Sequence, residues 1–178
     1  MEPKKIKVHD LHFEEFIPSE DIQKAVNRIA DEIRPHYTDK KLLVIGVLNG
    51  AVYFTIDLLR QLDLPYRLDF IQASSYDGTT STGQVTLTKI KEDIANSHIL
   101  LIEDIVDTGR TIDVIKTRLQ NENPASIRVA SLFYKPDADE HKNPPDFIGF
   151  SIPNHFILGY GLDYNSLGRE LPDVYKVR

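Results

Sequence analysis

The chain has 178 residues, of which 41% are hydrophobic and 27% are charged, and its formal net charge is -6. This length favours a single domain, residues 1–178, with an adequate core, and the negative charge argues against generic binding to nucleic acids or anionic membranes. The chain has no cysteine, which excludes disulfides, zinc–thiolate sites and a thiol nucleophile. No signal peptide or transmembrane run is visible, so the default expectation is a cytoplasmic location.

An amphipathic helix is predicted near the N-terminus. Ser19 follows Pro18 and is a favourable N-cap residue, with acidic residues in the next turn. Apolar residues then recur with helical spacing as far as Ile33, and Pro35 is expected to end the helix. We interpret this helix as part of the scaffold.

The next two predicted elements form a βα unit. Leu42–Val47 is predicted to be a buried strand, and helical spacing follows from Val52. Leu48, Asn49 and Gly50 turn the chain between them, at the end of the strand where ligands bind in open α/β sheets. The spacing alone favours an ordinary turn over a binding loop at this point.

A long polar stretch separates the two strands predicted at Tyr66–Ala73 and Val85–Ile90. It runs from Ser74 to Gln84 and is too long for a tight hairpin turn. The composition favours an exposed hairpin tip, and the alternative is a lid that closes over a reacting site.

The most informative stretch places a strand, an acidic end, a glycine-bearing loop and a helix in immediate succession. The apolar run Ile99–Ile102 predicts a buried strand that ends at Glu103 and Asp104. The loop is Asp107, Thr108, Gly109, Arg110 and Thr111, and a helix is predicted over residues 111–122. The loop offers N–H groups and hydroxyls to a phosphate, and the paired carboxylates suit the vicinal hydroxyls of a sugar. A ribose 5-phosphate fits this pattern, whereas a capped turn after a solvated strand end is the structural alternative.

The last third of the chain is predicted to be β-rich. Ile127–Tyr134 reads as a strand that ends at Lys135, where a lysine is usually a solvated cap. Residues 137–145 are polar and are interpreted as a surface loop. The aromatic, glycine-punctuated residues 145–165 suit a β-rich cap on the sheet, and the alternative is a surface on which Phe156 stacks against a flat base.

The segment Ile102–Thr111 resembles the phosphoribosyl-pyrophosphate signature of the type I phosphoribosyltransferases, and especially of their hypoxanthine-guanine branch. The resemblance extends from Leu42 to Arg169, and at Ser75, Tyr76 and residues 81–83 it favours the lid over the hairpin tip. It implies an α/β fold with a parallel sheet flanked by helices and a small hood built partly from the C-terminal segment. It also implies transfer of the 5-phosphoribosyl group from phosphoribosyl pyrophosphate to hypoxanthine, and also to guanine, in purine salvage. Homodimers or homotetramers are usual in the family.

The resemblance further implies a role for individual residues. Asp107 is the expected general base for the purine N7 proton. The phosphoribosyl group is expected to bind Glu103, Asp104, Asp107, Thr108, Gly109, Arg110 and Thr111. Pyrophosphate is expected to bind Ser75, Tyr76, Arg169 and the loop Leu48, Asn49 and Gly50, whose first peptide bond is often cis in the family. The purine is expected to bind Lys135, Phe156, Ile157 and Asp163. The expected ligands of Mg²⁺ are Glu103, Asp104 and Asp163.

Two alternatives stay open on the sequence. A non-catalytic protein of the same fold could sense phosphoribosyl pyrophosphate and regulate expression, although the chain has no added DNA-binding segment and retains Asp107. A sister enzyme could act on xanthine, adenine or orotate. Lys135 and Phe156 favour a 6-oxopurine over adenine, because a cation at O6 selects against a 6-amino group.

Overall fold

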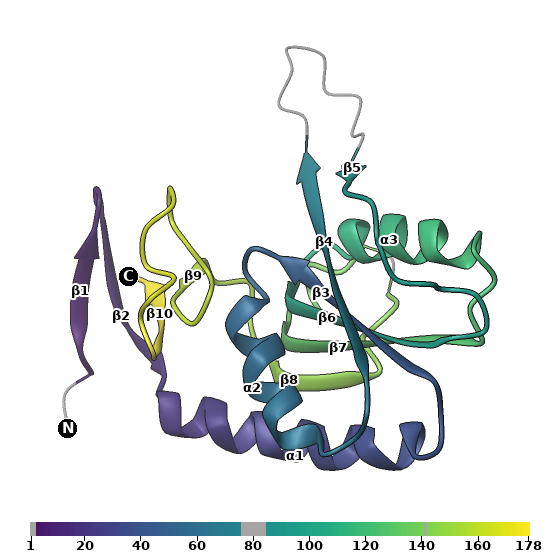
Figure 1. Ribbon diagram of the computed structural model, residues 1–178. Coiled ribbons are helices and arrows are strands. Elements are labelled where there is room, and N and C mark those ends of the chain that lie inside the picture. Colours follow the sequence, from purple (N-terminus) through teal and green to yellow (C-terminus); the bar gives the residue numbers. More distant parts are fainter. Residues whose placement is uncertain (1–2, 76–84, 141) are drawn as a thin grey trace.

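The computed structural model describes residues 3–75, 85–140 and 142–178, and its largest feature is a six-stranded sheet (Figure 1). The strand order is β5-β4-β3-β6-β7-β8. The strands are β3 (Leu42–Leu48), β4 (Arg67–Ser75), β5 (Val85–Leu87), β6 (His98–Val106), β7 (Ser126–Tyr134) and β8 (Phe147–Ser151). β5 is antiparallel to β4, and the other neighbouring strands are parallel. The predicted α/β fold is thus confirmed.

Helices cover both faces of this sheet. The helices are α1 (Ser19–Tyr37), α2 (Val52–Leu62) and α3 (Arg110–Gln120), and α3 lies on the opposite face from α1 and α2 (Figure 1). Alternate side chains of β3 serve the two faces: Val44 packs with the first two helices, and Ile45 packs with α3. This two-sided burial explains why the strand is a continuous apolar run. No helix in the described part of the chain is long and apolar enough to cross a membrane.

Both ends of α1 differ from the prediction. Pro18 occupies the N-cap position, and the backbone N–H of Ser19 donates to Asp173 Oδ1 at 2.8 Å, so a carboxylate distant in sequence caps the helix. At the other end, Pro35 lies inside the helix, which continues to Tyr37. The buried Tyr37 donates its hydroxyl to the carbonyl of Ile99 at 3.1 Å. This contact and the burial stabilise the last turn and offset the hydrogen bond that proline cannot make.

A second, antiparallel sheet forms the predicted hood from both ends of the chain. Its order is β1-β2-β10-β9, and its strands are β1 (Lys5–Val8), β2 (Leu11–Ile17), β9 (Ile157–Leu158) and β10 (Val174–Val177). Phe13, Leu158 and Tyr175 form its buried core. The C-terminal contribution was predicted. The pairing of β2 with β10 was not predicted, because it joins residues from opposite ends of the sequence.

Two contacts attach the hood segment to the end of the six-stranded sheet. The hydroxyl of Tyr160 donates to Asp57 Oδ2 on α2 at 2.7 Å. The backbone of Gly161 approaches the carbonyl oxygen of Gly50 so closely that a Cβ atom at Gly161 would overlap it. Because Gly161 also has a φ of +97°, glycine is the residue that suits this crossing. The crossing brings the hood over the turn that follows β3.

Candidate active site

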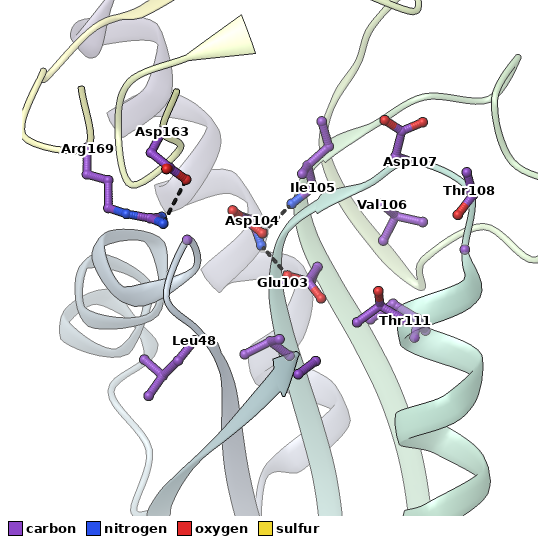
Figure 2. A pocket seen from close by; sticks show the side chains of 15 residues that line it. Leu48, Glu103, Asp104, Ile105, Val106, Asp107, Thr108, Thr111, Asp163 and Arg169 are labelled. Carbon is purple, nitrogen blue, oxygen red and sulfur yellow. Dashed lines mark hydrogen bonds and ion pairs between the residues drawn. The ribbon is translucent and has the colours of Figure 1, made fainter. Parts of the chain in front are cut away.

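A cavity of about 410 Å³ lies at the carboxyl ends of β3 and β6, where the fold is expected to bind ligands (Figure 2). The predicted site residues that line it are Leu48, Gly50, Glu103, Asp104, Asp107, Thr108, Gly109, Thr111, Asp163 and Arg169. They come from three separate stretches of the chain, residues 48–50, 103–111 and 163–169. The structure therefore brings together most of the residues that the sequence pattern singled out.

The acidic pair lies within β6 and not beyond its end. The strand continues to Val106 because its last residues are apolar and pair with β7, with Ile105 opposite Phe133. Successive side chains of a strand point to opposite faces. Accordingly, Glu103 is buried with 6% of its surface exposed, whereas Asp104 is partly exposed. Both side chains contribute to the cavity wall.

The environment of Glu103 favours its protonated form. Burial, and then the adjacent charge of Asp104, raise the pKa of the Glu103 carboxyl well above its ordinary range. The backbone N–H of Asp104 donates to Glu103 Oε1 at 3.3 Å, and that of Ile105 donates to Asp104 Oδ1 at 2.9 Å (Figure 2). The pair is therefore poised to take up a cation, which would compensate the charge that burial disfavours.

The turn after β3 packs directly on this pair. A Cβ atom at Gly50 would overlap the Asp104 carboxylate, so a larger residue here would displace that side chain from its present position. The Leu48–Asn49 peptide bond is cis, as the resemblance implied. Leu48 and Gly50 line the cavity, whereas Asn49 is exposed and does not line it.

The loop that opens α3 has the geometry of a phosphate site. Gly109 occupies the N-cap position with a φ of +81°, and no side chain caps the helix. The first N–H groups of α3 and the positive end of its dipole thus lie at the cavity, together with Thr108 and Thr111. Arg110 is the exception. Its guanidinium pairs with Glu140 Oε2, at 2.7 Å from Nη2 and 3.1 Å from Nε, and does not line the cavity.

Lys135 contacts the predicted general base directly. Its side chain is only 7% exposed, so it is not a solvated strand cap, and Nζ donates to Asp107 Oδ2 at 2.8 Å. The backbone N–H of Lys135 also donates to the carbonyl of Val106 at 3.0 Å. Asp107 is half-exposed and faces the cavity. Two residues for which the resemblance implied separate roles therefore form one ion pair in this structure.

The hood supplies the opposite wall of the cavity. Asp163 and Arg169 form an ion pair of 2.7 Å, and Arg169 Nη1 also donates to the carbonyl of Gly161 at 2.6 Å (Figure 2). Phe156 and Ile157 do not line this cavity: Ile157 is buried in β9, and Phe156 is 44% exposed. The Phe156 ring packs edge-on against that of Tyr164, with ring centroids 5.6 Å apart.

Two predictions fall in part beyond what can be described. Tyr76 and most of the Ser74–Gln84 stretch, the candidate lid, lie outside the described residues. Ser75 ends β4. This strand pairs with β3, and β3 in turn pairs with β6, which carries the acidic pair.

Glu103 and Asp104 are the carboxylates at the cavity that could hold a magnesium ion. In residues 3–75, 85–140 and 142–178, no group of three or more histidine, aspartate or glutamate side chains is arranged to hold a metal. Asp163, the third predicted ligand, is engaged by Arg169 across the cavity from Glu103 and Asp104. Magnesium commonly uses one or two carboxylates and completes its shell with water and phosphate oxygens. Two adjacent carboxylates meet that requirement.

Sequence reasoning missed the apolar part of the cavity wall. Val47, Ala73, Ile105, Val106 and Ile112 line it and were expected only in the core or left unassigned. Their position at the carboxyl ends of strands, or at the start of α3, was a usable signal, because that edge of the sheet is where ligands bind.

Comparison with known proteins agrees with this geometry. Residues 14–165 match the phosphoribosyl transferase domain family, and the chain belongs to this family. A relative from Tritrichomonas foetus, a hypoxanthine-guanine-xanthine phosphoribosyltransferase, is 42% identical over 87% of this chain and 86% of its own length. The hypoxanthine phosphoribosyltransferase of Haemophilus influenzae is 35% identical over 93% and 96%. A crystal structure of a Staphylococcus aureus hypoxanthine phosphoribosyltransferase superposes with a TM-score of 0.87 at 34% identity, covering 92% of this chain and 90% of that one.

Proposed function

We propose that this chain is a purine salvage enzyme that transfers the 5-phosphoribosyl group from phosphoribosyl pyrophosphate to hypoxanthine, with guanine as a second base. The observation that carries the proposal is that the Lys135–Asp107 pair lies beside an uncapped helix N-terminus and an acidic pair. The family and the names of its relatives support the same activity. They do not support a non-catalytic regulator.

Each part of phosphoribosyl pyrophosphate has a counterpart in the cavity. The 5′-phosphate accepts hydrogen bonds from the loop around Gly109 and the first turn of α3. The ribose 2′- and 3′-hydroxyls donate to Glu103 and Asp104. Pyrophosphate lies between the turn at Gly50 and the forked guanidinium of Arg169, which can leave Asp163 to meet it.

The reaction needs a cationic transition state to be held between these groups. The bond from C1′ to pyrophosphate breaks, the bond from C1′ to the purine N9 forms, and the N7 proton passes to Asp107. Lys135 turns from Asp107 to the purine O6, which selects a 6-oxopurine and releases the carboxylate to act as base. Phe156 stacks on the base, and Ile157 meets its edge through the backbone of β9.

Mg²⁺ is the cofactor proposed for this chemistry, and Glu103, Asp104 and Asp163 are the residues that would hold it. When bound, it neutralises the pyrophosphate charge and fixes its orientation. Burial disfavours the ionised form of Glu103, and a cation bound beside it would offset that cost. We further propose a homodimer or homotetramer that acts in the cytoplasm. Molar mass from light scattering and cell fractionation test these two statements.

The test is a base-competition assay. Phosphoribosyl pyrophosphate and Mg²⁺ are supplied with hypoxanthine, guanine, xanthine or adenine in separate reactions, and nucleotide formation is followed with and without a chelator. The proposal predicts product from hypoxanthine and guanine that the chelator abolishes. Xanthine is included because the relative from Tritrichomonas foetus is named for it. Product from xanthine or adenine alone would overturn the base assignment, and phosphoribosyl pyrophosphate binding without product from any base would overturn the enzyme.

A further inference from the structure

The turn after β7, which comprises Lys135 to Glu140 and Lys142 to Asn143 and which we call the β7 turn, follows the phosphate loop closely. Its first residue bonds to the start of that loop, through the backbone to Val106 and through Nζ to Asp107. Farther along, the backbone N–H of Glu140 donates to the carbonyl of Thr108 at 3.3 Å. The polar segment that the sequence predicts to be a surface loop is therefore hydrogen-bonded to the phosphate loop beside the cavity.

The β7 turn is itself held in shape by a buried carboxylate. Asp139 is only 6% exposed. Its Oδ2 accepts from the Tyr134 hydroxyl at 2.9 Å and from the backbone N–H of Asn143 at 3.1 Å, and its Oδ1 accepts from the N–H of Lys142 at 3.1 Å. A buried carboxylate satisfied in this way fixes the local backbone, because moving it would leave charged oxygens without donors.

Glu140 contacts the phosphate loop on both sides of its most permissive residue, Gly109. Its backbone holds Thr108, and its carboxylate holds the guanidinium of Arg110 in the forked pair described above. Gly109 lies between these two points with a φ of +81°, and a glycine loses more conformational freedom on ordering than any other residue. Pinning both of its neighbours keeps the loop N–H groups aimed at the cavity.

We propose that Glu140 and Arg110 are positioning residues that preorganise the 5′-phosphate loop, anchored through Asp139 and the β7 turn. This inference rests on the proposed function, since it assigns that loop to the 5′-phosphate. It gives Arg110 a role different from a phosphate ligand: the guanidinium acts on the substrate through the loop. Preorganisation improves affinity by reducing the entropy lost when the loop orders around its ligand.

The pair is exposed, with side-chain exposures of 67% for Arg110 and 52% for Glu140, so a moderate effect is expected. Arg110→Met and Glu140→Gln should each weaken phosphoribosyl pyrophosphate binding by about two- to fivefold, as for other exposed ion pairs. Because both changes break one interaction, the double variant should be no weaker than either single variant. The charge-reversed variant Arg110→Glu with Glu140→Arg should recover part of the loss.

The experiment measures Kd for ribose 5-phosphate and for phosphoribosyl pyrophosphate with Mg²⁺, then KM for hypoxanthine, kcat and Tm. The matched control is the Arg118–Glu122 ion pair at the far end of α3, which has similar exposure and no contact with the loop. Arg118→Met and Glu122→Gln should leave both Kd values unchanged. The proposal that Glu140 and Arg110 preorganise the loop is supported if Arg110→Met and Glu140→Gln bind both phosphate ligands more weakly and leave KM for hypoxanthine unchanged.

Three results would overturn the proposal that Glu140 and Arg110 preorganise the loop. Weaker binding in Arg110→Met with none in Glu140→Gln makes Arg110 a direct phosphate ligand. Unchanged Kd in both variants removes the pair from substrate binding. Equal losses in the Arg118 and Glu122 controls reduce the effect to general stability. A wild-type protein that binds neither ribose 5-phosphate nor phosphoribosyl pyrophosphate would instead remove the proposed function, so the two failures are distinguishable.

Discussion

Glu103→Gln should stabilise the ligand-free protein and at the same time weaken substrate binding. The Glu103 side chain is buried in β6 beside Asp104, and burial raises the pKa of its carboxyl well above the ordinary value of 4.5. The folded protein therefore holds this proton more tightly than the unfolded chain does. Ionising the Glu103 carboxyl in the folded state costs free energy, and the fold retains this unfavourable group at the site.

The pH dependence has a definite sign. Between 4.5 and the raised pKa the folded state binds more protons than the unfolded state, so stability falls as pH rises through this window, and the penalty is complete above it. Glutamine is neutral at every pH and removes the penalty. Each unit of raised pKa corresponds to about 1.4 kcal/mol, which in a protein of this size is a Tm difference of about 3–6 °C.

The assay is thermal unfolding of the wild type and the variant at mildly acidic and mildly alkaline pH, without Mg²⁺ or substrate. The Tm of Glu103→Gln should exceed that of the wild type at alkaline pH, and the difference should shrink toward acid. Glu122→Gln, just beyond the C-terminal end of α3, is the control and should show no such trend. A variant that is less stable than the wild type at alkaline pH, or a difference that does not change with pH, would refute the reasoning about burial.

Three further predictions follow from the same contacts. At neutral pH, phosphoribosyl pyrophosphate with Mg²⁺ should release a proton from Glu103 on binding, because a cation favours the ionised form; calorimetry in buffers of different ionisation enthalpy should detect this in the wild type and not in Glu103→Gln. Lys135→Met should raise KM for hypoxanthine about 10–100-fold, the worth of a hydrogen bond to a charged group, with little change in Kd for phosphoribosyl pyrophosphate in equilibrium titrations. Tyr160→Phe should lower the free energy of unfolding by about 0.5–1.5 kcal/mol in urea titrations, because Asp57 loses its donor from the hood.

The elements that the sequence predicted well are those with a strong local pattern. β3 and β6 are buried on both faces, so their apolar runs were unambiguous, and the loop at Gly109 combines a strand end, a glycine and a helix start. The end of β6 was placed too early because two carboxylates interrupt the run. Pairing with β7 carries the strand past them, and that information is not local.

The features that could not be predicted depend on residues far apart in the chain. Asp173 caps α1 from the last part of the sequence, and β2 finds its partner in β10. Lys135 and Asp107 each had a recognisable position, yet nothing in the spacing indicated their ion pair. The partner of Arg110 was equally hidden, because Glu140 lies in a polar segment with the composition of an ordinary surface loop.

The measurement that tests the central claim most directly is the effect of Asp107→Ala on turnover and on binding. Asp107 lines the cavity and pairs with Lys135, and the proposed reaction assigns it the role of base for the purine N7 proton. The account predicts that kcat falls by about 10²–10⁴-fold, whereas Kd for phosphoribosyl pyrophosphate with Mg²⁺ changes far less. An unchanged kcat with an unchanged pH dependence, in a variant that retains its Tm, would contradict the assignment of Asp107 as the general base.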